Sequence, residues 1–181
     1  MKEQWRRLGG EILFDAHIFR LRRDAYEHEG WPTRPFYVLE SNPWINVVPV
    51  TAKGEIVLVR QYRHGIQEAT LEVPGGLVDA TDRDPAAAAV RELLEETGHA
   101  GAPPELLGRV SSNPAILDNW TYCYVVRDAR PVGMPNPDPH EDVTVEIQPA
   151  ARVREMVLKG EIHHSLSACA LLLFFMTESS R

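Results

Sequence analysis

The segment from Asp84 to Gly98, DPAAAAVRELLEETG, constrains the fold more than any other part of the sequence. Asp followed by Pro is typical of a helix N-terminus, the alanines favour helix, and a glycine after the last helical turn is typical of a C-terminus. The segment therefore predicts a helix over residues 85–97. Three glutamates stand in its last turns, although the partial negative charge of a helix C-terminus normally favours Lys or Arg there.

The helical period places Glu92, Glu95 and Glu96 within an arc of roughly 100°. Arg91 can pair with Glu95 four residues later, which leaves Glu92 and Glu96 as a like-charge couple that costs a few tenths of a kcal/mol. A divalent cation would convert this repulsion into a binding site, and Mg²⁺ prefers such oxygen ligands together with substrate phosphates. The alternative is a solvated acidic face on a surface helix.

The remaining segments predict strands on both sides of this helix. Residues 8–40 hold two apolar-rich stretches separated by EGWPT, which indicates a small β-rich N-terminal section over residues 1–40 and a main domain over 41–181. WINVVPV (44–50) and EIVLVRQY (55–62), joined by TAKG, predict a hairpin of buried strands. Further strands are expected at 71–75, 106–111, 120–127 and 143–149, a proline-rich loop at 128–142, and closing helices within 150–160 and 165–176. This order predicts a mixed α/β fold with helices on both faces of a sheet.

The composition excludes several classes of protein. The net charge of −7 disfavours a protein that holds long nucleic acid, although a small phosphate ligand remains compatible with it. Cys123 and Cys169 lie in apolar runs and are interpreted as core residues and not as a disulfide framework. No N-terminal signal is visible, and the run ACALLLFFM is too short to span a bilayer. We therefore expect a soluble cytoplasmic protein without membrane contact.

The segment from Gly76 to His99 resembles the Nudix box, G-x5-E-x7-R-E-U-x-E-E-x-G-U, where U is a bulky apolar residue. RELLEETG matches the second half of this pattern at every position. The resemblance implies an α/β/α sandwich, a loop–helix–loop site for Mg²⁺ or Mn²⁺, and hydrolysis of a nucleoside diphosphate linked to another group. It implies metal ligation by Glu92, Glu95 and Glu96, completed by the Gly75 carbonyl, with Glu96 also catalytic.

The box departs from the pattern in its first half. Asp82 and Arg83 occupy the two positions that could match the first glutamate, the loop is one residue longer, and His99 stands at the last apolar position. In the family the missing glutamate mainly holds the box arginine. Asp82, shorter but on a longer loop, is the candidate to reach Arg91 instead.

The segments RQYR (60–63) and LEVPGGL (71–77) resemble the ADP-ribose pyrophosphatase branch of the family. By this resemblance Arg63, with Arg60 beside it, contacts the diphosphate, and Glu72 contacts metal-bound water or the terminal ribose. The alternative for both arginines is a place on a solvated strand rim. Pro114, fifteen residues after His99, resembles the proline associated with ADP-sugar hydrolases, although the surrounding SSNPAILDN differs from the usual Ser-Pro-Gly form.

The proline-rich loop ends in HEDV, just ahead of a strand. ADP-sugar hydrolases often carry the general base on this loop, so Glu141 is the candidate and Asp142 the alternative, against solvated loop acids. Trp31 or Trp44 could stack on a base, although core packing is the commoner role of Trp. His163 and His164, without further ligands nearby in the sequence, are interpreted as cap or surface residues.

The resemblance thus implies an enzyme that hydrolyses a nucleoside diphosphate sugar such as ADP-ribose to a nucleoside monophosphate and a sugar phosphate. Alternatives within the family are hydrolysis of dinucleoside polyphosphates, nucleoside triphosphates or RNA 5′ ends, or a binding module without catalysis. Related ADP-sugar hydrolases use an N-terminal section to build a dimer. We therefore expect a homodimer whose interface includes residues from 8–40.

Overall fold

The computed structural model describes residues 4–137 and 142–179 of the chain. It divides into two compact units. The first unit comprises the described residues up to Asn42 together with the segment Ser111–Trp120, and the second contains Pro43–Val110 and the chain from Thr121 onward.

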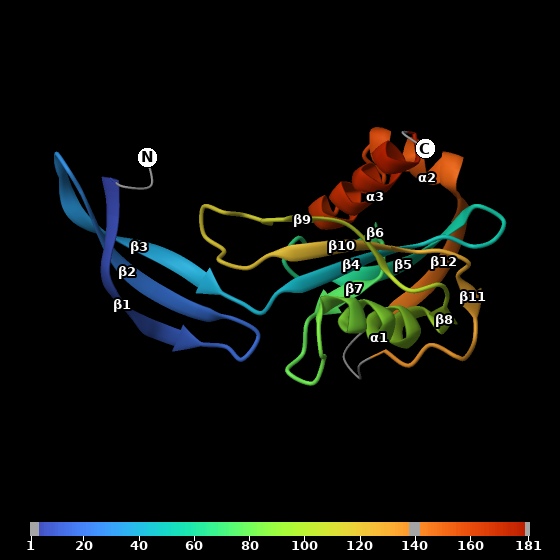
Figure 1. Cartoon of the computed structure of the whole chain (residues 1–181), viewed down its shortest axis with the longest axis horizontal. Helices are drawn as coiled ribbons and strands as arrows, with labels where there is room; N and C mark the ends of the chain where they lie inside the picture. Colours follow the sequence, from blue (N-terminus) through green and yellow to red (C-terminus); the bar gives the residue numbers. More distant parts are fainter. Residues whose placement is uncertain (1–3, 138–141, 180–181) are drawn as a thin grey trace. The chain divides into compact units, whose positions relative to one another are not determined.

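The first unit is built on a three-stranded antiparallel sheet in the order β1-β2-β3 (Figure 1). Its strands are β1 (Trp5–Asp15), β2 (Arg20–His28) and β3 (Trp31–Glu40). The first apolar stretch of the sequence is thus two strands, because the chain reverses around His17, which has a left-handed φ of 66°. The second reversal uses Gly30, with φ of 79°, and β3 then begins at Trp31, inside the segment expected to be a turn.

The described residues of the second unit form three sheets. A four-stranded sheet has the order β7-β4-β10-β9, a three-stranded sheet the order β12-β5-β6, and β11 pairs with β8. Their bounds are β4 Trp44–Pro49, β5 Glu55–Arg63, β6 Glu68–Glu72, β7 Gly75–Leu77, β8 His99–Ala100, β9 Glu105–Val110, β10 Thr121–Val126, β11 Arg130–Pro131 and β12 Val143–Pro149.

The expected hairpin of residues 44–62 is wrong. Both strands are buried, but β4 pairs in parallel with β10 and antiparallel with β7, whereas β5 pairs with β12 and β6. Only an isolated bridge between Val50 and Ile56 joins their ends. Two apolar strands with a short connection favour a hairpin locally, but partners from distant parts of the chain compete for the same strand edges and prevail here.

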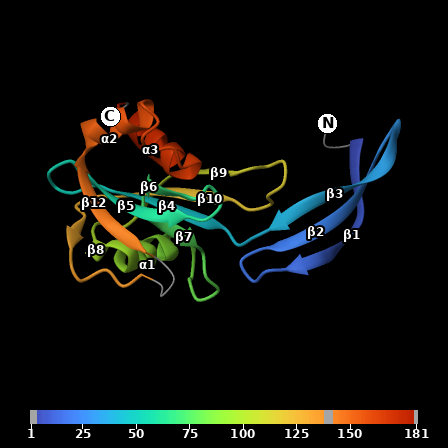
Figure 2. The same cartoon turned by 180° about the vertical axis from the view of Figure 1, so that it is seen from behind.

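Three helices cover the sheets of the second unit: α1 (Pro85–Thr97), α2 (Ala150–Leu158) and α3 (Ser165–Glu178). Both views show α1 on one side of the strands and α2 with α3 on the other (Figures 1 and 2). Alternate residues of β10 enter different cores, since Tyr124 and Val126 pack in the cluster that includes α1, and Cys123 and Val125 in the cluster that includes α2 and α3. The predicted α/β/α sandwich is confirmed.

Among the described residues, no helix combines the length and the apolarity that a membrane crossing requires. Cys123 and Cys169 are both free thiols, and Cys123 is fully buried in the core.

Candidate active site

The helix α1 carries the acidic cluster and is capped as the sequence predicts. The Asp84 carboxylate accepts the Ala87 N–H at 2.8 Å, and Pro85 occupies the first turn. Gly98 ends the helix in the left-handed conformation, with φ of 67°, and its N–H donates to the Leu94 carbonyl. The last turn holds no basic residue, so the glutamates stand at an end whose dipole does not favour them.

Arg91 organises the outer half of this cluster. Its Nη1 donates to Glu92 and to Glu95, each at 2.9 Å. Its Nη2 donates to the Leu77 carbonyl at 3.0 Å and to Asp82 Oδ2 at 2.9 Å, while Nε donates to Asp82 Oδ1 at 3.2 Å. The fork formed with Asp82 first, and the carboxylates of Glu92 and Glu95 further, raises the pKa of Arg91 despite its partial burial.

Asp82 therefore reaches Arg91, as expected for the residue that replaces the glutamate of the box. Its side chain is only 7% exposed, and the hydrogen bonds from Arg91 hold the pKa of its carboxyl below the usual range. The longer loop compensates for the shorter side chain. His99, the other departure from the box, is buried in β8 and its Nδ1 lies 2.7 Å from the Thr97 carbonyl.

The inner half of the cluster faces a glycine turn. Glu96 is 2% exposed, and its Oε2 accepts the Gly75 N–H at 3.0 Å. A β-carbon at Gly75 would lie 2.3 Å from the Ile45 carbonyl oxygen, and one at Gly76 would lie 2.2 Å from Glu92 Oε1. The missing side chain at Gly75 thus lets the turn lie against β4, and the missing side chain at Gly76 lets it lie against Glu92 of the helix.

The structure thus brings Glu92, Glu96 and the Gly75 backbone together, while Glu95 is more exposed and is paired with Arg91. Within the described ranges, no three His, Cys, Asp or Glu side chains converge on one point as a metal site requires. The donor set nevertheless fits Mg²⁺, because it consists of carboxylate oxygens beside a polar backbone turn. Two of the carboxylates, those of Glu92 and Glu96, belong to well-buried side chains.

A second charged group lies on β5 and β6. Arg63 donates from Nε and Nη2 to the two oxygens of Glu72, both at 2.7 Å, and the Thr70 hydroxyl donates to Glu72 Oε1. Glu72 is 1% exposed. Burial alone would raise the pKa of this carboxyl, but the hydrogen bonds from Arg63 and Thr70 outweigh burial and lower it. This pair is a bidentate fork that fixes the plane of the guanidinium.

Arg60 has a different partner. Its Nε donates to Glu146 on β12 at 2.6 Å, on the opposite side of β5 from β6. Residues three apart in a strand point to opposite faces, so the spacing of Arg60 and Arg63 already separates their side chains. The described contacts do not bring the two arginines together.

His164 is the functional candidate that sequence reasoning missed. Its Nδ1 lies 3.0 Å from Glu72 Oε2 and 2.9 Å from the Ser167 hydroxyl. It is the N-cap residue of α3, in line with the expectation of a cap or surface residue, although its side chain makes no capping hydrogen bond. No signal in the sequence could have found this contact, because His164 and Glu72 lie far apart in the chain and only the tertiary structure brings them together.

The remaining candidates lie elsewhere or outside the described residues. Glu141 falls outside the described residues, and Asp142 is an exposed residue directly before β12. Pro114 lies in the segment Ser111–Trp120 of the first unit. Trp31 is an exposed residue of β3, and Trp44 is half-buried at the start of β4.

The segment Ser111–Trp120 is held by the end of β3. The Leu39 N–H donates to the Ile116 carbonyl at 2.7 Å, and the Asp118 carboxylate accepts the Ser41 N–H at 3.3 Å. Asp118 also lies 3.5 Å from the Arg22 guanidinium on β2. The connection between β9 and β10 therefore packs with the N-terminal strands, although in the sequence it lies between two parts of the second unit.

Comparison with known proteins agrees with this geometry. The family model of the NUDIX domain matches residues 42–166, which include α1, the glycine turn and the Arg63–Glu72 pair. The chain belongs to the Nudix family. It is 31% identical to the ADP-ribose pyrophosphatase of Mycobacterium tuberculosis over 166 residues, which cover 91% of this chain and 80% of that protein.

Two further relatives extend the comparison. The methanol dehydrogenase activator of Bacillus methanolicus is 28% identical over 65% of this chain and 63% of its own length. A solved structure described as an ADP compounds hydrolase superposes with a TM-score of 0.85 at 21% identity, covering 98% of this chain and 95% of that chain. The structural likeness supports the Nudix fold of this chain.

Proposed function

We propose that this Nudix hydrolase cleaves the diphosphate of a nucleoside diphosphate sugar, with ADP-ribose as the first substrate to test. The products would be a nucleoside monophosphate and a sugar phosphate. The observation that carries the proposal is the presence of two features in one domain. A helix rich in carboxylates contacts a glycine turn, and the guanidinium of Arg63 is fixed by Glu72. The similarity to an ADP-ribose pyrophosphatase over 91% of the chain supports the sugar-linked substrate.

Glu92, Glu95 and Glu96, with the Gly75 carbonyl, would hold Mg²⁺ or Mn²⁺. Such an ion, when bound, supplies positive charge that orients the attacking water and offsets charge on the phosphate oxygens. Arg91 already bridges Glu92 and Glu95, and this contact keeps both carboxylates in place on the outer side of the helix. Glu96, held by the Gly75 N–H, is the most buried of the three.

The arginines would bind the diphosphate. Arg63 is held ionised and oriented by Glu72, which suits a guanidinium fork that must meet phosphate oxygens. Arg60 would contribute to the same task only by exchanging Glu146 for the substrate. Glu72 would accept a hydrogen bond from a ribose hydroxyl or from metal-bound water, in addition to the donors that it already binds.

Glu141 would act as general base and take the proton of the attacking water, with Asp142 as the alternative.

A panel of substrates tests the proposal. The protein is incubated with Mg²⁺ and ADP-ribose, other nucleotide sugars, dinucleoside polyphosphates, nucleoside triphosphates or capped RNA, and the release of phosphate monoesters is measured. We expect the highest kcat/KM with a nucleotide sugar. A value one hundredfold higher with another class would assign the enzyme to that class, and no turnover of any member would favour a binding module.

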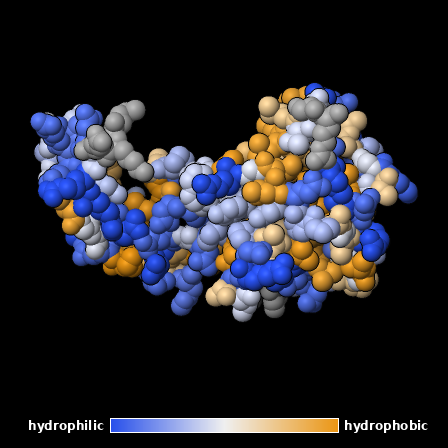
Figure 3. Space-filling model, viewed as in Figure 1, coloured by the Kyte–Doolittle hydropathy of each residue, from blue (hydrophilic) through white to orange (hydrophobic). Residues whose placement is uncertain are grey.

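We also propose that the strands of residues 1–40 form a dimerisation section of a homodimer. A three-stranded sheet needs a covered apolar face to be stable, and β1 and β3 expose several large apolar side chains. Apolar side chains (orange) lie among hydrophilic ones (blue) on the surface formed by these strands (Figure 3). The large apolar side chains that β1 and β3 expose are Trp5, Leu8, Ile12, Leu13, Phe14, Trp31 and Tyr37.

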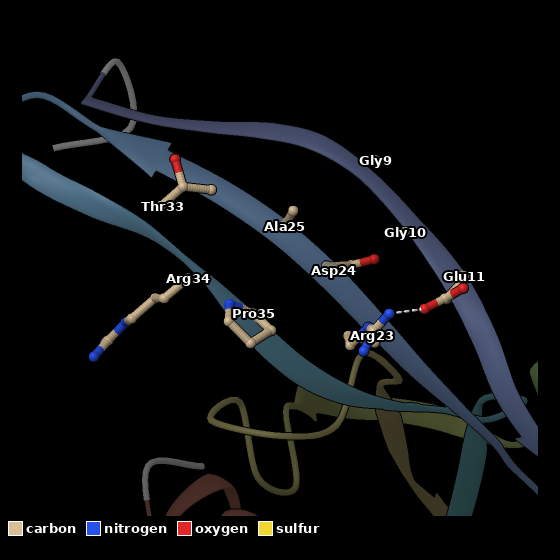
Figure 4. Close-up of a pocket in the computed structure, with 9 residues that line it drawn as sticks. All are labelled: Gly9, Gly10, Glu11, Arg23, Asp24, Ala25, Thr33, Arg34 and Pro35. Carbon is tan, nitrogen blue, oxygen red and sulfur yellow. Dashed lines mark hydrogen bonds and ion pairs between the residues drawn. The ribbon is translucent and has the colours of Figure 1, made fainter.

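This sheet also contains a hollow of about 530 Å³ (Figure 4). Asp24 is fully buried there, close to the Gly9–Gly10 backbone of β1. Arg34 and Pro35 of β3 also line the hollow. A β-carbon at Gly10 would lie 2.0 Å from Asp24 Oδ1, so the glycine is needed for the approach of the two strands. A hollow in an otherwise exposed sheet suits a segment of a second copy.

Light scattering tests the homodimer. We expect a dimer at micromolar concentration, and we expect Phe14→Glu to shift it toward monomer because a charge would enter the interface. Leu158→Glu is the matched control, since Leu158 is an exposed apolar residue of the second unit. A monomeric wild-type protein, or an equal shift in both variants, would refute the assignment of this surface.

A further inference from the structure

The first turn of α3 contacts the segment that leads from β6 into the glycine turn. His164, directly before the helix, contacts Glu72, and Ser167 in the first turn accepts the Val73 N–H at 3.2 Å. Ser167 is fully buried. Two consecutive residues ahead of the metal-binding turn are therefore held by the same helix terminus.

The imidazole of His164 lies between two polar groups. Its Nδ1 is 3.0 Å from Glu72 Oε2 and forms a hydrogen bond of 2.9 Å with the Ser167 hydroxyl. A carboxylate oxygen only accepts hydrogen bonds, so the tautomer with hydrogen on Nδ1 is assigned to this contact, because a bare nitrogen lone pair would be repelled by the carboxylate. Burial, opposed by the Glu72 carboxylate and reinforced by the positive charge of Arg63, holds the pKa of His164 below its ordinary value of 6.5.

The same segment continues directly to the carboxylate helix. The Pro74 carbonyl accepts the Val47 N–H at 2.8 Å, and the Gly75 N–H donates to Glu96 at 3.0 Å. Each residue from Glu72 to Gly75 thus has a fixed partner, and the partners lie on four different elements. The position of Glu72 determines the orientation of Arg63 on one side and the start of the glycine turn on the other.

We propose that His164 is a positioning residue that holds the Glu72 carboxylate, so that Arg63 is aimed at the diphosphate and the Val73–Gly75 turn keeps its place against Glu96. The role in diphosphate binding rests on the function proposed above. The contact of His164 Nδ1 adds a third polar neighbour at 3.0 Å to a buried carboxylate that accepts hydrogen bonds from Arg63 and Thr70. A buried carboxylate that loses one of its polar neighbours is stabilised less and is free to rotate toward the remaining ones.

The neighbouring His163 provides a matched control. Its Nε2 lies 3.8 Å from Glu68, and both side chains are largely exposed, so this pair contributes little. A substitution there changes the same kind of residue at the same helix start without touching Glu72.

The experiment compares His164→Ala, His164→Asn, His164→Gln and His163→Ala in the full-length protein. The amide nitrogen of Asn stands at the position of imidazole Nδ1, whereas that of Gln lies farther from the backbone. With ADP-ribose and Mg²⁺, we expect His164→Ala to raise KM about tenfold with a smaller change in kcat, the scale of one lost polar contact with a charged group. His164→Asn should recover at least half of that loss on a logarithmic scale, and His163→Ala should match the wild type.

Amide hydrogen exchange supplies a readout that does not depend on turnover. We expect the Val73 and Gly75 amides to exchange faster in His164→Ala and His164→Gln than in His164→Asn and His163→Ala. If the wild type cleaves no nucleotide sugar, the proposed function fails while this readout still decides the role of His164. Equal exchange and equal KM in His164→Asn and His164→Gln would overturn the positioning role, even if His164→Ala does not fold.

Discussion

The bond between Asp82 and Arg91 gives the sharpest test of how this chain tolerates its altered box. Asp82→Ala removes two hydrogen bonds to the guanidinium, at 2.9 and 3.2 Å, and the acceptor for the Asp79 N–H. Arg91 keeps the Leu77 carbonyl and the carboxylates of Glu92 and Glu95 as partners. The substitution therefore weakens one side of the loop–helix contact and leaves the other in place.

The magnitude follows from burial. Two hydrogen bonds to charged groups would contribute about 3–6 kcal/mol if both partners were fully buried. Asp82 is well buried, but the Arg91 side chain is 25% exposed and retains other acceptors, so water and these acceptors recover part of the loss. We expect a decrease of about 2 kcal/mol in the free energy of unfolding, equivalent to a Tm lower by roughly 4–8 °C in a chain of this size.

Urea and thermal unfolding of the purified variants measure this loss. Asp79→Ala is the control, because Asp79 lies 3.5 Å from the same guanidinium but is more than half exposed, and it should cost less than about 0.5 kcal/mol. The double substitution Asp82→Ala with Arg91→Ala should cost less than the sum of the two single ones, because both remove the same bonds. A loss in Asp82→Ala no larger than in Asp79→Ala would refute the view that Asp82 replaces the missing glutamate.

Three further predictions concern catalysis, metal and pH. A chelator should abolish turnover, and Mg²⁺ or Mn²⁺ should restore it. Glu96→Gln or Glu92→Gln should lower kcat by at least about 10²-fold. Full activity in Glu96→Gln would contradict the site assignment. Glu141→Gln should lower kcat with little change in KM in steady-state assays, whereas a loss only in Asp142→Asn would move the base to that residue. Burial alone would raise the pKa of Asp24, but hydrogen bonds from two arginines lower it below its ordinary value of 3.8. The stability that this ionised carboxylate contributes is therefore present above about pH 4 and is lost as the pH falls through the lower folded-state pKa, so Asp24→Asn should flatten the decline of the unfolding free energy measured from about pH 5 to pH 2.

Local chemistry in the sequence was sufficient to predict the helix that carries the candidate site. The cap at Asp84, the stop at Gly98 and the 3.6-residue period place Glu92 and Glu96 on one face of a helix without reference to the rest of the chain. The layered fold also followed from the order of apolar strands and helices, because each element must bury its apolar face against another. The contact of Asp82 with Arg91 was expected from the resemblance to the Nudix box, in which the residue missing from this loop holds the arginine.

Other features depended on contacts between distant segments, which no local pattern records. The sequence predicted that β4 and β5 form a hairpin, but each pairs with a strand far along the chain. The distant partners cover more of the strand edges than β4 and β5 would cover by pairing with each other. His164 is the N-cap residue of α3, within the expectation of a cap or surface residue, but its contact with Glu72, which precedes it by more than ninety residues, could not be expected from the sequence. Arg60 and Arg63 read as one phosphate-binding pair, but strand geometry gives them partners on opposite neighbours of β5. Only the tertiary structure could decide these, because the free energy of a buried charge depends on which donors surround it and not on which residues adjoin it in the chain.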